Sequence, residues 1–270
     1  MSDAPKLLGP GEGEDIGGRI RIKCARPELV LTETAGTGET EPHVHREHAD
    51  VFWVLEGALS VWLGEEEHVL EPGDFGLAPP EVVHRYRSEG ARWLNIHAPG
   101  CGFEGWLRSR GTDEAFDQHP PPGDGGRPPE EGVLLRRGEG ELIELGPLAR
   151  GWVKAGADDG LGSVSLVEAE LGPENSGPPA HRHAGLTDSF YVLDGTLTVL
   201  LGEERHQVPA GGYALVPPGN VHSVANAGER PVRFLNVTAP GGLERYLREL
   251  AGADPADFAA IAARHDVIPA

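Results

Sequence analysis

The sequence predicts an all-β protein made of two tandem barrels with short flanking helices, and two observations carry this prediction. The 270 residues include 39 glycines and 24 prolines but only 6% aromatic residues, which is typical of a turn-rich chain of short strands. A series of separated positions also recurs 138 residues further along the chain, which indicates an internal repeat. The length is sufficient for two domains of ordinary size.

The repeat centres on histidines, an aspartate and turn residues that keep one spacing in both halves. In the first half these are His43, His45, Asp50, Gly57, Gly73, Pro79 and His84, and in the second half His181, His183, Asp188, Gly195, Gly211, Pro217 and His222. The match continues through residues 94–100 and 235–241 at an offset of 141, so three extra residues are expected near Gly228. We interpret the chain as a tandem duplication.

Short strands separated by turn signals account for most of each half. Apolar or alternating runs lie at residues 20–22, 29–31, 43–45, 51–55, 59–63, 82–84, 93–96, 164–171, 181–183, 190–193, 197–201 and 213–216. Short helices are expected at residues 102–108, 242–248 and about 257–263, covering the base of each barrel.

The predicted division places the first barrel in residues 1–110 and the second barrel, with its C-terminal helices, in residues 133–270. Residues 111–132 are expected to be a linker. Their proline- and glycine-rich run can form neither a helix nor a central strand, because proline lacks the backbone donor.

Each half carries the residues of a divalent-metal site. Side chains alternate along a strand, so the two histidines of His43-x-His45 or His181-x-His183 point to the same side. A carboxylate on the next strand and a third histidine after a tight turn complete the set. Imidazole and carboxylate suit Fe, Ni, Co, Cu, Mn or Zn without choosing among them. The alternative is a group of packed core histidines without metal, which would crowd polar nitrogens that need partners.

Two further expectations concern residues near these sites. His48 is interpreted as a solvated turn residue. The alternative is that it lines the entrance of the first metal site. By strand parity with the aspartates, Phe52, Val54, Phe190 and Val192 face inward and form an apolar wall.

Charge and composition exclude several partners. The formal net charge of −20 argues against nucleic acid and against an anionic membrane surface, which both require clustered Lys and Arg. No run approaches the ~18 apolar residues of a membrane span, and the N-terminus lacks the apolar core of a secretion signal. Cys24 and Cys101 are interpreted as reduced thiols of a cytoplasmic protein, with a bridge inside the first half as the alternative.

These motifs resemble those of the cupin superfamily, and the duplication resembles a bicupin. The first motif, His-x-His followed by an acid and a glycine, is present in both halves. The second motif is complete in the second half, from Gly211 to Asn226, which favours that half as the better preserved. In the first half Glu81 replaces a glycine and Ser88 an asparagine. The resemblance implies two jelly-roll (double-stranded β-helix) barrels.

The resemblance also implies a function similar to that of the flavonol (quercetin) 2,3-dioxygenases: metal-dependent dioxygenation of a small aromatic or enolic substrate. Asp50 and Asp188 would act as metal ligands or as general bases. The family's usual acid is glutamate, and aspartate reaches about 1.5 Å less far. The alternatives are a metal-dependent isomerase or cyclase and a non-catalytic small-molecule-binding bicupin. The expected partners are a small-molecule substrate and, for the oxygenase, dioxygen, in a monomer or homodimer.

Overall fold

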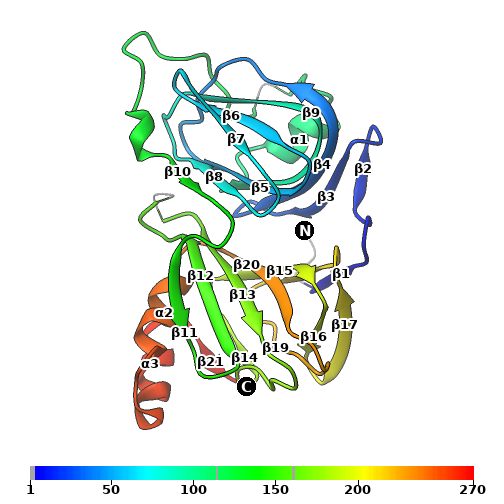
Figure 1. The fold of residues 1–270 in the computed structure, drawn as a ribbon, viewed down its shortest axis with the longest axis vertical. Coiled ribbons are helices and arrows are strands. Elements are labelled where there is room, and N and C mark those ends of the chain that lie inside the picture. Colours follow the sequence, from blue (N-terminus) through cyan, green and yellow to red (C-terminus); the bar gives the residue numbers. More distant parts are fainter. Residues whose placement is uncertain (1–3, 114, 160–161) are drawn as a thin grey trace. The chain divides into compact units, whose positions relative to one another are not determined.

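A computed structural model describes residues 4–113, 115–159 and 162–270. The chain forms two compact units, one containing Gly13–Glu139 with Ala157–Val164, and the other containing the N-terminal residues to Glu12 together with Gly140–Gly156 and Ser165–Ala270. Both units are built mainly from antiparallel strands (Figure 1). The predicted all-β class with short helices is confirmed.

The first unit has one sheet with the strand order β10-β8-β5-β9-β4-β3-β2, and the hairpin β6–β7 joins it through β9. Its strands are β2 (Glu14–Ile16), β3 (Ile20–Ala25), β4 (Val30–Glu39), β5 (Ala49–Glu56), β6 (Leu59–Leu63), β7 (Glu66–Leu70), β8 (Phe75–Ala78), β9 (His84–Ala98) and β10 (Val133–Leu135). The helix α1 (Phe103–Arg108) and the short 3-10 turn η1 (Pro129–Glu131) complete it.

The second unit has two sheets, with the strand orders β1-β18-β15-β20-β13-β12-β11 and β17-β16-β19-β14-β21. Its strands are β1 (Lys6–Leu8), β11 (Glu141–Glu144), β12 (Ala149–Ala155), β13 (Ser165–Leu171), β14 (His181–Arg182), β15 (Thr187–Asp194), β16 (Thr196–Leu201), β17 (Glu204–Pro209), β18 (Tyr213–Val216), β19 (His222–Ala225), β20 (Val232–Ala239) and β21 (Ile268–Pro269). Its helical elements are α2 (Leu243–Leu250), η2 (Pro255–Asp257) and α3 (Phe258–Arg264). None of the helices in the described ranges is long and apolar enough to span a membrane.

The boundaries of the two units differ from the expected ones, because each unit combines segments from separate parts of the chain. The N-terminal strand β1 pairs with β18 of the second unit, and β10 pairs with β8 of the first unit. The expected linker is also part of the first unit, because His119 pairs with Val44 and Arg127 with Val82. Residues 1–3 of the expected first barrel and residue 114 of the expected linker lie outside the described residues.

Apolar side chains fill the interior of each barrel from the faces that strand parity predicts. Phe52 and Val54 of β5 pack in the first core, and Phe190 and Val192 of β15 pack in the second. All four are at most 2% exposed, so the expected apolar walls are present. Asp50 of β5 and Asp188 of β15 lie on the same inward faces as these apolar side chains.

The three-residue insertion separates two strands that are continuous in the first half. Where β9 runs unbroken for 15 residues, β19 and β20 are separated by a loop that contains Gly228. Asn226 holds this loop through side-chain hydrogen bonds to the carbonyls of Leu171 and Arg230. Ser88 serves the equivalent bend by donating to Gly36 O and accepting from Ala91 N. Serine therefore substitutes for asparagine where the connection is shorter.

Candidate metal centre

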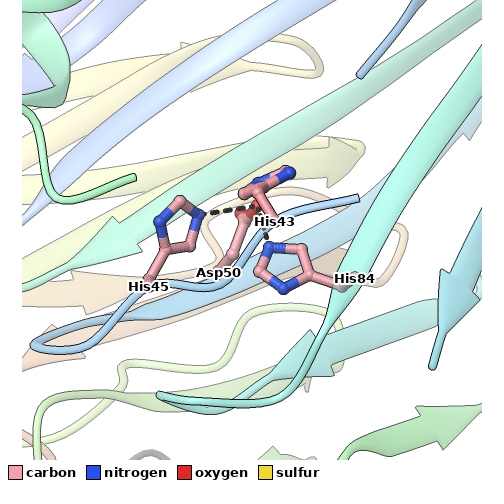
Figure 2. A group of neighbouring side chains, drawn as sticks. All are labelled: His43, His45, Asp50 and His84. Carbon is pink, nitrogen blue, oxygen red and sulfur yellow. Dashed lines mark ion pairs between the residues drawn. The ribbon is translucent and has the colours of Figure 1, made fainter. Parts of the chain in front are cut away.

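The first centre gathers His43, His45, Asp50 and His84 inside the barrel of the first unit (Figure 2). His43 forms a β-bridge with His84 at the start of β9, which places the first and third histidines side by side. One ligand atom of each of the four residues lies within 4.8 Å of the others. All four side chains are buried. The structure therefore brings together the four residues that the spacing in the sequence singled out.

The second centre gathers His181, His183 and His222, whose ligand atoms also lie within 4.8 Å of one another. Asp188 lies beside them, with its Oδ2 3.2 Å from His222 Nε2 and 3.9 Å from His183 Nε2. His181 is only partly buried, so this centre is more open to solvent than the first. The more enclosed centre thus belongs to the half with the degraded motif.

Backbone carbonyls fix the orientation of all six imidazoles. Four of the rings place Nδ1 against the carbonyl two residues earlier in the chain: His43 on Glu41, His84 on Val82, His181 on Pro179 and His222 on Asn220. His45 and His183 instead use the carbonyls of Asp117 and Asp266, at 2.5 and 2.7 Å. Because a carbonyl only accepts, each Nδ1 carries the hydrogen, and Nε2 is the ring nitrogen that can bind a metal ion. In His222 this Nε2 lies 3.2 Å from Asp188 Oδ2.

The first centre has the features that a divalent transition metal requires. His45 Nε2 and His84 Nε2 are buried and have no hydrogen-bond partner among the described residues. They lie 3.9 and 3.5 Å from Asp50 Oδ2. Buried polar atoms normally have partners, and two unpaired nitrogens facing one carboxylate suit a shared cation. The residues present therefore fit such an ion, although they do not select its identity.

Burial and mutual proximity keep His43 and His45 neutral. Burial, reinforced by the neighbouring histidines, lowers the pKa of His43 to about 3. Burial likewise lowers the pKa of His45 to about 4, against an opposing effect of Asp50. Burial raises the pKa of the Asp50 carboxyl, but His97, His45 and His84 outweigh it and hold that pKa well below its usual value. At neutral pH the centre therefore presents the uncharged imidazoles of His43 and His45 beside the ionised carboxylate of Asp50, as a metal ion requires.

In the second centre His222 behaves differently. Burial lowers its pKa, but the hydrogen bond and charge of Asp188 outweigh this and place the pKa above its ordinary value. The partly exposed His181 has a lowered pKa, through burial and then through the charge of His222. A proton therefore competes for the second centre more strongly than for the first.

An asparagine pins the aspartate of each centre. Asn95 Nδ2 donates to Asp50 Oδ1 at 2.5 Å, and Asn236 Nδ2 donates to Asp188 Oδ1 at 2.5 Å. In each case the other carboxylate oxygen remains directed at the histidines. Sequence reasoning gave these residues no role. The signal was present, because both asparagines lie in the matched segments at an offset of 141.

His48 is fully buried, and its interpretation as a solvated turn residue is wrong. Its Nδ1 lies 3.0 Å from Asp117 Oδ2 and its Nε2 lies 2.8 Å from His97 Nδ1. The rings of Phe116 and Phe103 cover this pair, and Phe103 stacks on His97 with centroids 3.7 Å apart. In the second half Leu186 and Thr238 occupy the equivalent positions, so only the first centre has this pair.

The two cysteines are not joined. Cys24 is a buried free thiol and Cys101 is a partly buried one. Burial, followed by the charges of Asp117 and Glu47, raises the pKa of the Cys101 thiol to about 11, so it stays protonated at neutral pH. The bridge considered as an alternative is therefore absent from this structure.

The fold and the duplicated histidine sets define the class of protein. The model of the cupin domain matches residues 30–97 and 167–238, so the chain belongs to the cupin family and is a bicupin. Both matched segments include the spacing that the two halves share and from which the duplication was inferred.

Among curated proteins, the chain is similar to quercetin 2,3-dioxygenase of Bacillus subtilis (strain 168). The two are 26% identical over 292 residues, covering 91% of this chain and 86% of that protein. A quercetin 2,3-dioxygenase of Aspergillus japonicus is 28% identical over 87 residues, covering 30% of this chain and 25% of that protein.

Solved structures share the fold at low sequence identity. A putative glyoxylate-induced protein from Pseudomonas aeruginosa has a TM-score of 0.63 and 17% identity, covering 88% of this chain and 89% of that chain. A mutant of Bacillus subtilis oxalate decarboxylase has a TM-score of 0.55 and 15% identity, covering 80% and 70%. These neighbours support the bicupin fold alone.

Proposed function

We propose that this bicupin is a metal-dependent dioxygenase that acts on a small aromatic or enolic substrate, in the manner of the flavonol dioxygenases. The histidine ligands are His43, His45 and His84 in the first centre, and His181, His183 and His222 in the second, and Asp50 and Asp188 serve as a fourth ligand or as the general base. The observation that carries the metal assignment is the arrangement of the six imidazoles, each with Nδ1 on a carbonyl and Nε2 toward its centre. The similarity to quercetin 2,3-dioxygenase along 91% of the chain supports the reaction class.

When bound, the metal supplies Lewis acidity, which favours the anion of a substrate hydroxyl or enol. The protein's part is to orient the substrate and to accept its proton. Asp50 Oδ2 and Asp188 Oδ2 are the acceptors, since Asn95 and Asn236 occupy the other oxygen of each carboxylate. The low pKa of Asp50 keeps it ionised and ready to accept, and it makes Asp50 a weak base for an unactivated hydroxyl.

The apolar wall supports a flat, largely apolar substrate. Phe52 and Val54 lie on the same face of β5 as Asp50, and Phe190 and Val192 on the same face of β15 as Asp188. Apolar surroundings strengthen the electrostatic interactions of the site and limit side reactions with water. A carboxylate beside such a wall suits an aromatic hydroxyl or an enolisable ketone better than a small dianion.

The test is dioxygen consumption by the protein loaded with iron, nickel or cobalt, measured with an oxygen electrode across flavonols, catechols and 1,3-diketones. The proposal predicts uptake with at least one substrate class, lost in the double variant His45→Ala, His183→Ala. The variant His206→Ala is the matched control, because this histidine lies on β17 and pairs with Glu204 away from both centres. No uptake with any metal and substrate would overturn the oxygenase and leave the isomerase, cyclase or binding alternatives.

A further inference from the structure

The second histidine of each centre depends on a distant part of the chain. His45 Nδ1 and His183 Nδ1 bind the carbonyls of Asp117 and Asp266, whereas the other four ring nitrogens use carbonyls only two residues away. Asp117 follows α1 and Asp266 follows α3. In both halves, the orientation of this one ligand is therefore set by a segment outside the barrel strands.

The same two aspartates also hold the loop that follows the histidine. Asp117 Oδ2 accepts from Arg46 N at 3.0 Å and from Glu47 N at 2.7 Å. In the second half, the Asp266 carboxylate accepts from Ala184 N at 2.7 Å and from Gly185 N at 2.9 Å. One residue thus fixes both the ring and the backbone beside it.

Both segments are joined to the ligand strand and anchored in the core. His119 pairs with Val44, between the two histidines of the first centre. In the second unit β21 pairs with β14, which carries His181. A buried apolar residue adjoins each aspartate: Phe116 is 6% exposed and Val267 is 8% exposed.

The backbone of Asp266 adds an independent sign of constraint. Its φ of 58° lies in the left-handed region, which most non-glycine residues avoid. Residues persist in such conformations only where the surrounding structure determines them, and they cluster at functional sites. At Asp266 this conformation accompanies the carbonyl contact with His183 and the carboxylate contacts with the following loop.

We propose that Asp117 and Asp266 are positioning residues that fix the second histidine ligand of their own centre, and we call this arrangement the aspartate clamp. The inference rests on the proposed metal centres. It extends them to residues that lie outside the segments matched by the cupin domain model and that do not share the spacing of the repeat. A carboxylate that merely capped a loop would contribute to stability without affecting metal affinity at one centre.

The experiment measures Co²⁺ affinity at one centre at a time, by chelator competition and by the visible absorption of bound Co²⁺. A His84→Ala parent isolates the second centre, and a His222→Ala parent isolates the first. In the His84→Ala parent, Asp266→Gly removes the carboxylate but tolerates the left-handed backbone. The carbonyl that binds His183 Nδ1 remains in this variant, but the carboxylate no longer holds it in place. Loss of a partner that orients a metal-binding histidine typically lowers affinity roughly 10- to 100-fold, and the expected effect is at the lower end of this range.

Three comparisons separate positioning from general destabilisation. Asp266→Asn tolerates the left-handed backbone and keeps one of the two acceptor oxygens, so it should recover part of the affinity. Asp254→Ala is the matched control, because Asp254 also accepts a backbone hydrogen bond, from Ala256, but contacts neither centre. Asp266→Gly in the His222→Ala parent should leave the first centre's affinity unchanged. Asp117→Ala should weaken Co²⁺ binding in the His222→Ala parent, which reports on the first centre, and should leave it unchanged in the His84→Ala parent.

The outcomes distinguish this inference from the proposed function. If the parents bind Co²⁺ and Asp266→Gly binds it as tightly as its parent, the clamp is overturned and the metal centres stand. If Asp254→Ala or the distant centre weakens as much as the clamped centre, the effect is general and the clamp is again overturned. If neither parent binds Co²⁺, the metal centres fail and the clamp fails with them.

Discussion

Replacing Asn95 with leucine tests whether the aspartate of the first centre is held in place for a metal ion. The substitution keeps the size of the side chain but removes the donor that binds Asp50 Oδ1 at 2.5 Å. It also removes the amide oxygen that lies 3.1 Å from His97 Nε2. Asn236→Leu is the equivalent change in the second centre, where the same donor binds Asp188 Oδ1.

The magnitude follows from the kind of hydrogen bond that is lost. A hydrogen bond to a charged group contributes about 1.5–3 kcal/mol. At about 1.4 kcal/mol per factor of ten, this corresponds to roughly 10- to 100-fold weaker metal binding if the carboxylate is a ligand. The pKa of Asp50 should also rise toward its ordinary value, because its ionised form loses a donor.

The assay measures the Zn²⁺ affinity of the first centre by competition with a chromophoric chelator at neutral pH. It uses the His222→Ala parent, in which the second centre lacks one of its ligands. Circular dichroism checks that the variant is folded. A change in affinity below about twofold in a folded variant would refute the reasoning, because it would show that the fixed carboxylate does not contribute to metal binding.

Three further predictions follow from neighbouring features. His48→Leu should lower the free energy of unfolding by about 1–3 kcal/mol in urea titrations, because it leaves the buried His97 Nδ1 without its partner. Adding His97→Thr should recover part of this loss. If the loss in the double variant equals the sum of the losses in the two single variants, His48 and His97 are not coupled and the prediction is wrong. Glu81→Gly should stabilise the protein by about 1 kcal/mol and raise Tm by about 2–4 °C, because Glu81 has φ 72° at a turn where glycine is unstrained; an unchanged or lower Tm would contradict this. As the pH falls from about 7.5 to about 5.5, the second centre should release Zn²⁺ before the first, because the pKa of His43 is about 3 whereas that of His222 lies above its ordinary value. Dialysis followed by metal analysis measures this release. Loss of Zn²⁺ from both centres at the same pH would show that proton competition does not distinguish them.

The sequence was sufficient for the parts of the molecule that depend on local pattern. Alternation along a strand placed both histidines of each pair on one side, and the repeat identified the aspartate and the third histidine of each centre. The turn at Glu81 illustrates how a motif can change without loss of its geometry. Its φ of 72° matches the 84° of Gly219, and its N–H binds His45 O as that of Gly219 binds His183 O.

The parts of the structure that the sequence did not predict depend on contacts between distant segments of the chain. β1 and β10 have only three residues each, and nothing in so short a segment indicates which sheet edge it will join. His48 has the signals of an exposed turn, and its burial results from Phe116, which lies far along the chain. Asp117 and Asp266 follow helices in segments of different length, so the repeat could not align them.

Metal content per chain tests the central claim most directly, namely that each barrel holds one ion through its three histidines. Elemental analysis would be made on the wild-type protein, on His45→Ala and on His183→Ala, after reconstitution and removal of free metal. The account predicts close to two equivalents of a divalent transition metal in the wild-type protein and the loss of one equivalent in each variant. A wild-type protein without bound metal, or variants that retain both equivalents, would contradict it.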